Sequence, residues 1–223
     1  MLIDKGKRWA IELDDIVAAQ TDLPLLNKFT DDAAQQMKIS IETSFFADST
    51  IYAGMHASNT GLTAGVHSES FDIGTTGSPV ELSSDNVIDL IVDCGSVLDE
   101  QNVPETGRWF IIPIWMANLI KKSDIKDASM MGDGASVLRN GRIGMLDRFE
   151  LFASNLLNHS TTTYYHALFG TTDGITFATQ LTKIQRLPTP SDAFAERIRG
   201  LQVYGYKVVK PEAYGALICK KAA

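Results

Sequence analysis

A single apolar stripe near the start of the chain constrains the fold more than any other feature. Between Asp22 and Phe46, hydrophobic side chains recur at spacings of three and four residues, which is the period of an α-helix with one buried face. Asp22 is a suitable N-cap, and Pro24 falls in the first turn, where its missing N–H is harmless. The pattern predicts one helix of about 37 Å, long enough to be the spine of a thin domain. The stripe consists of Leu26, Phe29, Ala33, Met37, Ile41 and Phe45.

The rest of the chain mixes short strands with helices. Trp9, Ile11 and Leu13 lie on one side of an alternating pattern, so a strand is expected there, with its partner either downstream or in another chain. Strands are predicted at Lys7–Leu13, Arg108–Pro113, Arg148–Ala153, His166–Phe169 and Val203–Val209. Helices are predicted at Ser84–Asn102, Ile114–Lys122, Asp173–Ile184 and Asp192–Arg199, and irregular structure at Ala47–Pro79. This order of elements favours an α+β fold.

Charge and cysteine content exclude several classes of protein. The 223 residues include 20 Lys and Arg against 27 Asp and Glu, which gives a formal charge of −7. Such a surface repels phosphate, so a protein that reads nucleic-acid sequence is disfavoured, although a local basic patch remains compatible. The longest apolar runs are too short to span a bilayer, so no membrane partner is expected. Cys94 and Cys219 do not form a disulfide framework, and free thiols in a reducing cytosol are expected.

No residue pattern in the sequence indicates catalysis, a cofactor or a metal site. The histidines lack the close H-x-x-H spacing of a zinc site, and neither a nucleophile elbow nor a Walker-type phosphate loop occurs. The carboxylate pair Asp99-Glu100 falls at a helix end, where solvation is the default expectation. We therefore expect a protein that is not an enzyme, with no cofactor and no metal. A small hydrolase with an unrecognised site stays open, and it would need His159 or His166 beside carboxylates in a pocket.

Three local motifs, in a fixed order, resemble those of the major capsid proteins of tailed bacteriophages. The first is N-V-P-x-x-G-R-x-x-I-I-P at Asn102–Pro113, followed directly by the predicted helix at Trp115–Ile120. The second is G-R-I-G at Gly141–Gly144, which leads to a strand ending in Ser154-Asn155. The third is R-G-L-x-x-Y-G at Arg199–Gly205. Over nearly its whole length the chain is similar to the Hong Kong ninety-seven type capsid fold, closest to the coat proteins of short-tailed phages.

The resemblance implies a long spine helix, a peripheral domain and an axial domain. Family members carry an N-terminal arm and the outgoing half of an extended loop before the spine, so this chain is expected to be truncated, processed or shortened there. The implied assignment is residues 1–14 to the returning strand of that loop, 15–83 and 161–200 to the peripheral domain, 84–160 and 201–223 to the axial domain, and Ser123–Arg142 to the loop near the capsomer axis.

The function implied by the resemblance is that of a structural major capsid protein. Copies would assemble in the host cytoplasm into pentamers and hexamers of an icosahedral shell, which becomes the virion capsid and encloses phage DNA. Implied partners are further copies of the chain, a scaffolding protein and a portal, with DNA contacted weakly and without sequence specificity. An encapsulin-like compartment that holds cargo enzymes is the alternative on the same fold.

Aromatic and basic side chains are the candidate subunit contacts. Tyr204 and Tyr206 share one face of a predicted strand, which fits packing at a sheet surface or subunit contact better than stacking on single-stranded nucleic acid. Arg197 and Arg199 are suited to forked hydrogen bonds with a neighbour's carboxylates, or simply to the end of a helix. The candidate interface residues are Trp9, Arg108, Arg139, Arg142, Arg197, Arg199, Tyr204 and Tyr206.

Overall fold

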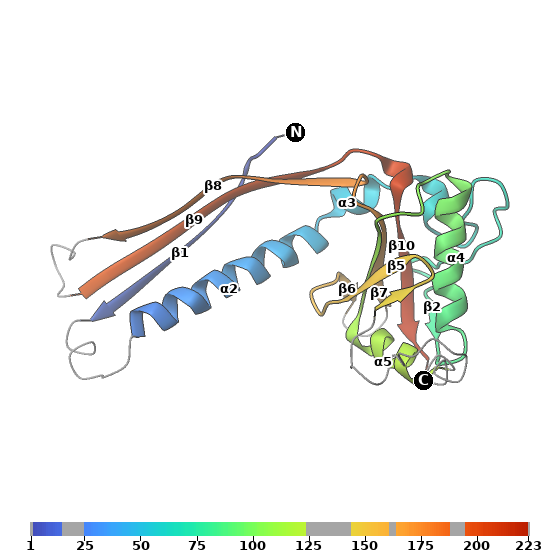
Figure 1. Ribbon diagram of the computed structural model, residues 1–223, viewed down its shortest axis with the longest axis horizontal. Coiled ribbons are helices and arrows are strands. Elements are labelled where there is room, and N and C mark those ends of the chain that lie inside the picture. The colour runs from blue at the N-terminus through green and yellow to red at the C-terminus, as the bar shows by residue number, and fades with distance from the viewer. Residues whose placement is uncertain (1, 15–24, 124–143, 161–163, 188–194, 223) are drawn as a thin grey trace. The chain divides into compact units, whose positions relative to one another are not determined.

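The long helix predicted from the apolar stripe is present in the computed structural model as α2, which spans Leu25–Phe46 (Figure 1). Its 22 residues correspond to about 33 Å. Burial increases along the stripe, from Phe29, which is exposed, to Ile41, which is buried. The predicted N-cap Asp22 and Pro24 lie outside the described part of the chain. The structure describes residues 2–14, 25–123, 144–160, 164–187 and 195–222.

The chain divides into two compact units, each built from two stretches of sequence. Unit 1 consists of Met1–Phe45 and Phe177–Lys207, and unit 2 consists of Phe46–Thr176 and Val208–Ala223. Each unit has its own sheet. The assignment of segments to a peripheral and an axial domain stays a prediction.

Unit 1 combines α2 with a three-stranded sheet in the order β1-β9-β8 (Figure 1). The strands are β1 (Lys5–Asp14), β8 (Ile175–Leu187) and β9 (Ala195–Val208). Strand β1 runs antiparallel to β9, so the predicted strand at the start of the chain finds its partner downstream in the same chain. Its odd-numbered residues are more buried than its even-numbered ones, as the alternating pattern predicted.

Two predicted helices of this unit are wrong. The segment with Phe177 and Ile184, predicted as a helix capped by Asp173, is the strand β8. Its many Thr, Ile and Phe side chains favour a strand, whereas the seven-residue separation of Phe177 and Ile184 fits a helix and puts them on opposite faces of a strand. The helix predicted at Asp192–Arg199 is replaced, from Ala195 onward, by β9. All of β1 pairs with β9 there, and this pairing overrides the weak helical preference of a short segment.

Unit 2 contains a seven-stranded mixed sheet with the helices α4 (Val87–Glu100) and α5 (Ile114–Lys122). The main strand order is β2-β10-β7-β3-β5-β4, and β6 pairs with β7. Strand pairs β10–β2 and β3–β5 are parallel, whereas β10–β7 and β3–β7 are antiparallel. The strands are β2 (Val80–Leu82), β3 (Arg108–Ile112), β4 (Met145–Leu146), β5 (Phe149–Ala153), β6 (His159–Ser160), β7 (Tyr164–Thr171) and β10 (Tyr214–Lys221).

The core of unit 2 lies between this sheet and the helices. Phe110, Phe149 and Phe169 meet from three adjacent strands, with ring centroids 5.4 to 6.2 Å apart. Buried residues of α4 and α5, such as Ile91 and Met116, belong to the same cluster. The predicted bounds of α5 and the predicted strand β3 are confirmed, because strongly periodic segments keep their local preference in a well-packed core.

Other parts of unit 2 differ from the sequence-based expectation. The region predicted to be irregular, Ala47–Pro79, contains the helix α3 (Ser49–Ala53) and the 3-10 turn η1 (Ala57–Asn59). The short apolar tail at the C-terminus is β10, which pairs on both sides and is buried along most of its length. A strand covered on both faces is apolar throughout, and therefore shows no alternation.

Gly170 on β7 is a position where the packing of β10 requires glycine. A Cβ there would lie 2.5 Å from Tyr214 Cβ and 2.7 Å from the Ala213 carbonyl oxygen, and neither atom is the end of a flexible chain. We expect Gly170→Ala to lower the free energy of unfolding by about 1–3 kcal/mol, measured by urea denaturation. Gly77→Ala is the matched control, since nothing lies within 4 Å of its added Cβ. Equal stability of the two variants would contradict this close approach of β7 and β10.

Candidate assembly interface

The predicted tyrosines lie in an aromatic cluster inside unit 1. Tyr204 and Tyr206 stack on one another at a centroid distance of 6.4 Å, and Phe177 stacks against both. Phe45 of α2 meets Tyr206 edge-on at 5.0 Å, and Lys5 Nζ lies 4.0 Å from the centre of the same ring. Tyr204 is only 1% exposed. The cluster therefore joins α2 to the sheet, in agreement with the expectation that these rings pack rather than bind nucleic acid bases.

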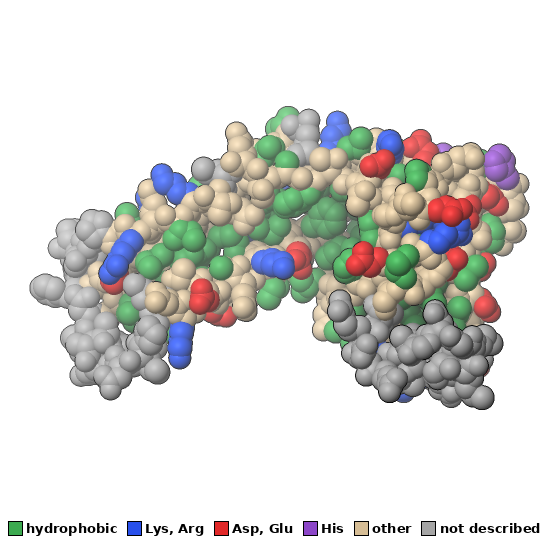
Figure 2. Space-filling view, viewed as in Figure 1, with side chains coloured by type: hydrophobic (Ala, Val, Ile, Leu, Met, Phe, Trp, Pro, Cys, Tyr) green, Lys and Arg blue, Asp and Glu red, His purple; other side chains and the backbone are tan. Residues whose placement is uncertain are grey.

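Trp9 covers a glycine on the neighbouring strand. Its indole lies directly over Gly200, which is paired with it in the β1–β9 register, so any side chain at Gly200 would displace the ring. Trp9 also borders a groove of about 550 Å³ between β1 and α2, together with Phe29 and Met37. Figure 2 shows hydrophobic side chains gathered along this seam between the strands and α2.

Arg197 and Arg199 belong to one face of the three-stranded sheet. Arg197 donates to the Glu12 carboxylate from Nε at 3.0 Å, and Arg199 donates to the Gln185 side-chain oxygen at 2.9 and 3.2 Å. In the register of β1 and β9, Arg197 lies opposite Glu12 and Arg199 lies opposite Ala10. Because these residues form a strand, the alternative that the two arginines end a helix is wrong.

The same face is hollowed, and basic side chains surround the hollow. Its volume is about 770 Å³. We call it the basic hollow; its main lining residues are Arg8, Lys183, Leu187, Arg197, Arg199 and Leu201.

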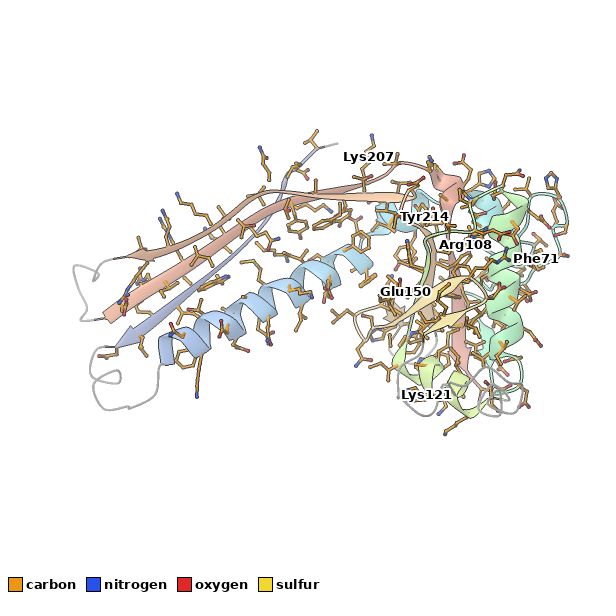
Figure 3. The ribbon with its side chains drawn as sticks, viewed as in Figure 1. Phe71, Arg108, Lys121, Glu150, Lys207 and Tyr214 are labelled. Carbon is orange, nitrogen blue, oxygen red and sulfur yellow. The ribbon has the colours of Figure 1, made fainter. Side chains whose placement is uncertain are left out.

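Arg108 lies in the interior of unit 2, where it joins β3 to the end of α4 (Figure 3). Its side chain is fully buried. It donates to the carbonyl oxygens of Pro104 at 3.0 Å, Gly95 at 3.3 Å and Val103 at 2.7 Å. It also forms an ion pair with Asp99 at 2.7 Å. The structure thus gives Arg108 a role in holding its own unit together.

The local sequence explains why these carbonyl groups face the arginine. Asn102 adopts a left-handed conformation with φ 56°, which ends α4. Its N–H donates to the Asp99 carbonyl and the N–H of Val103 donates to the Leu98 carbonyl, the pattern of a Schellman motif. Gly107, at φ 73°, then turns the chain into β3. Each fixed residue of the N-V-P-x-x-G-R segment therefore contributes to one helix-to-strand turn.

Asp99 and Arg148 also stabilise this turn, and the sequence did not predict their pairing. The Asp99 carboxylate, expected to be merely solvated, also accepts from Arg148 at 2.8 Å. Arg148 additionally pairs with Glu105 at 3.1 Å. Asp147 and Arg148 both have positive φ, as a two-residue turn between β4 and β5 requires. Non-glycine residues at both positions conceal this turn from sequence inspection.

The described residues bring no histidine together with a carboxylate in an ion pair. His166 is buried against the Tyr52 ring, and burial lowers its pKa. His159 stacks on Tyr165, with Nδ1 3.0 Å from the Leu157 carbonyl oxygen. Within the same described ranges, no group of three metal-ligating side chains is found.

The remaining predicted features are an arginine-bearing loop, two thiols and the absence of a membrane span. Arg139, Arg142 and most of the loop Ser123–Arg142 lie outside the described ranges. Cys94 and Cys219 are both buried free thiols in unit 2. None of the helices in the described ranges is long and apolar enough to cross a membrane.

Comparison with solved structures identifies the fold. The chain is similar to a protein of Mycobacterium phage Che8, with 27% sequence identity and a TM-score of 0.74 over 96% of this chain and 71% of that chain. It is similar to a protein in the capsid structure of the cyanophage P-SCSP1u, with 12% identity and a TM-score of 0.69 over 99% and 73% of the two chains. No protein-family model matches the chain, and no curated protein gives a significant match.

A further similarity extends beyond phages. The holo-SrpI encapsulin complex from Synechococcus elongatus PCC 7942 matches with 9% identity and a TM-score of 0.57, over 95% of this chain and 72% of that chain. The α+β fold is therefore one that occurs in capsids and in an encapsulin. Specifically, the chain has the fold of the major capsid proteins of tailed bacteriophages, with α2 as its spine helix.

Removing the Arg108 side chain should destabilise unit 2 strongly. Arg108→Met keeps the bulk of the side chain but leaves three carbonyl groups without their donor and Asp99 without its buried partner. We expect a loss of about 3–5 kcal/mol in the free energy of unfolding, measured by chemical denaturation. Arg148→Met, at a partly exposed site, is the control and should cost less than about 1 kcal/mol. Similar losses for the two variants would show that burial is not what makes Arg108 important.

The ion pairs of Asp99 predict a dependence of stability on acid. Partial burial alone would raise the pKa of Asp99, but hydrogen bonds and charges from Arg108 and Arg148 hold it below its ordinary value of 3.8. The unfolded chain then binds a proton at Asp99 more readily than the folded chain does. Asp99 therefore stabilises the fold at pH values above its ordinary pKa, and this stabilisation is lost as the pH falls through the lower pKa of the folded state. Between about pH 5 and about pH 3, the free energy of unfolding measured with urea should fall less for Asp99→Asn than for the wild type. Parallel pH profiles for the two proteins would refute this coupling.

Proposed function

We propose that the chain is the shell-forming subunit of a tailed-phage capsid, a structural protein rather than a catalyst. Copies assemble into pentamers and hexamers of an icosahedral shell that encloses phage DNA and becomes the virion capsid. Assembly takes place in the host cytoplasm, with a scaffolding protein and a portal as further partners. DNA is contacted weakly and without sequence specificity, in keeping with the net charge of −7.

The observation that carries this proposal is the extent of the structural similarity. Similarity to the Che8 protein covers 96% of the chain, and similarity to the cyanophage capsid structure covers 99%. Both compact units are therefore included, and little of the chain is left over for a separate catalytic domain. The match to Che8 also retains 27% identity, against 12% for the cyanophage structure and 11% for bacteriophage PhiM1.

The surface of the chain supports contacts with further copies. Edge strands carry exposed apolar side chains: Met145 on β4 is 74% exposed and Ile184 on β8 is 59% exposed. Exposed apolar groups on sheet edges favour association with another chain. Single contacts of this kind are modest, but closed symmetry repeats them many times, which makes the whole shell stable.

Subunit contacts at the predicted residues are part of this proposal. Trp9, Arg197 and Arg199 lie on or beside the sheet of unit 1, where a neighbouring copy has access to the two arginines. The assignment of the peripheral domain to residues 15–83 and 161–200, and of the axial domain to 84–160 and 201–223, is proposed on the same resemblance. Arg139, Arg142 and the loop that contains them are proposed to line the capsomer axis.

An encapsulin-like compartment is the second candidate. The similarity to the holo-SrpI encapsulin complex favours it, although the TM-score of 0.57 is below the 0.74 found for the Che8 protein. The two candidates differ in what the shell encloses, since a capsid holds DNA and an encapsulin holds protein.

Electron microscopy and light scattering of the purified full chain test the proposed function. We expect closed particles with five-fold and six-fold clusters of subunits. Nuclease-resistant DNA inside particles isolated from the producing cells would support the capsid, whereas co-purifying enzyme without DNA would support the encapsulin. A strict monomer at all concentrations, also in the presence of a scaffolding protein, would overturn both.

A further inference from the structure

The negative charge of the chain belongs to one of its two units. Unit 1 has ten basic and ten acidic side chains in the full sequence and is neutral overall, whereas unit 2 has ten basic and seventeen acidic side chains, for a net charge of −7. Two copies of unit 2 therefore repel one another, and an acidic face of unit 2 is attracted to a basic site on unit 1 of another copy.

Basic side chains of unit 1 gather at the basic hollow. Arg197 is neutralised by Glu12, but Arg8, Lys183 and Arg199 have no ion-pair partner among the described residues. Arg199 instead donates to a neutral amide, that of Gln185. The hollow also has apolar side chains within reach, since Leu201 is 36% exposed. Its chemistry suits a partner that offers carboxylates around a small apolar side chain.

The exposed face of α4 in unit 2 offers this combination. Val92 and Asp93 lie three and four residues after Asp89, so each of them is a neighbour of Asp89 on the surface of the helix. Val92 is 41% exposed, and neither aspartate has an ion pair among the described residues. Partial burial, and then the charge of Asp89, raise the pKa of Asp93, so the pair is a site of uncompensated negative charge.

We propose that the basic hollow of unit 1 binds the Asp89–Asp93 face of α4 from a second copy of the chain. Arg8, Lys183 and Arg199 then face the two carboxylates, and Val92 lies against Leu201. This contact is heterologous, because each copy offers its hollow to one neighbour and its α4 face to another, and such contacts propagate around a ring. The inference rests on the proposed function and identifies one of the surfaces through which the subunits meet.

Charge reversal on either side tests the contact in the full chain. Lys183→Glu with Arg199→Glu places carboxylates against carboxylates, and Asp89→Lys with Asp93→Lys places amines against basic side chains. Like charges brought together cost several kcal/mol, so each variant should raise the critical concentration for particle assembly by about tenfold or more. Light scattering against protein concentration gives that value, electron microscopy identifies the particles, and circular dichroism of the dissociated chains verifies the fold.

The quadruple variant, which carries all four reversals, is the decisive measurement. It restores opposite charges across the contact and should assemble within about threefold of the wild-type critical concentration. The matched control is Lys28→Glu with Lys207→Glu, which makes the same change of charge at exposed sites of unit 1 outside the hollow, Lys207 being labelled in Figure 3. This control should assemble like wild type.

The outcomes separate the contact from the function on which it rests. Wild-type particles together with normal assembly of either reversal, or a quadruple variant no better than the reversals, would overturn the contact and leave the capsid function standing. Reversals that form normal particles but lose DNA would mean that the hollow binds nucleic acid, which also overturns the proposal. A wild-type chain that never forms particles would overturn both.

Discussion

Both sheets depend on the last strand-forming stretch of the chain. Strand β9 lies between β1 and β8 in unit 1, and β10 lies between β2 and β7 in unit 2. A strand in either position hydrogen-bonds on both sides, so no other segment can substitute for it without leaving two rows of backbone groups unpaired. Residues 195–221 therefore complete the two units with consecutive elements. The close approaches at Gly170 and Gly200 follow from this, because each lets a bulky neighbour, Tyr214 or Trp9, lie against the backbone of the paired strand.

The arginines illustrate how burial decides what a charged side chain does. Arg108 is fully buried and has its hydrogen bonds satisfied by carbonyl groups that a Schellman motif and a glycine turn present to it. Arg199, on the exposed sheet face, meets only the neutral amide of Gln185 within the described part of the chain. The first arrangement fixes the geometry of one unit. The second leaves charge available to a partner, which is what a subunit that assembles with its own copies requires.

Elements with a long, regular pattern were predictable, and elements that depend on distant partners were not. The apolar stripe predicted α2, and the pattern at Ile114–Lys122 predicted α5 with its correct bounds, because local periodicity and core packing agree there. Strand β8 was predicted as a helix, since Phe177 and Ile184 are seven residues apart, which fits a helical period, and only the pairing with β9 makes the segment a strand. For Tyr204 and Tyr206 the sequence left packing at a sheet surface and a subunit contact both open, and the cluster inside unit 1 comes from the structure. The pairing of Asp99 with Arg148 joins residues 49 positions apart and leaves no local signal.

The amino-acid sequence by itself determined the α+β class, the spine helix, the strands β1, β3 and β5, and the order of motifs that resembles tailed-phage capsid proteins. These follow from local preferences, whose physical causes act over a few residues. Only the tertiary structure decided that Arg108 is interior, that the C-terminal tail is a central strand, and that four basic side chains from three strands surround one hollow. Such features arise where segments far apart in the chain are brought together, and their energy depends on burial and proximity that no short stretch of sequence contains.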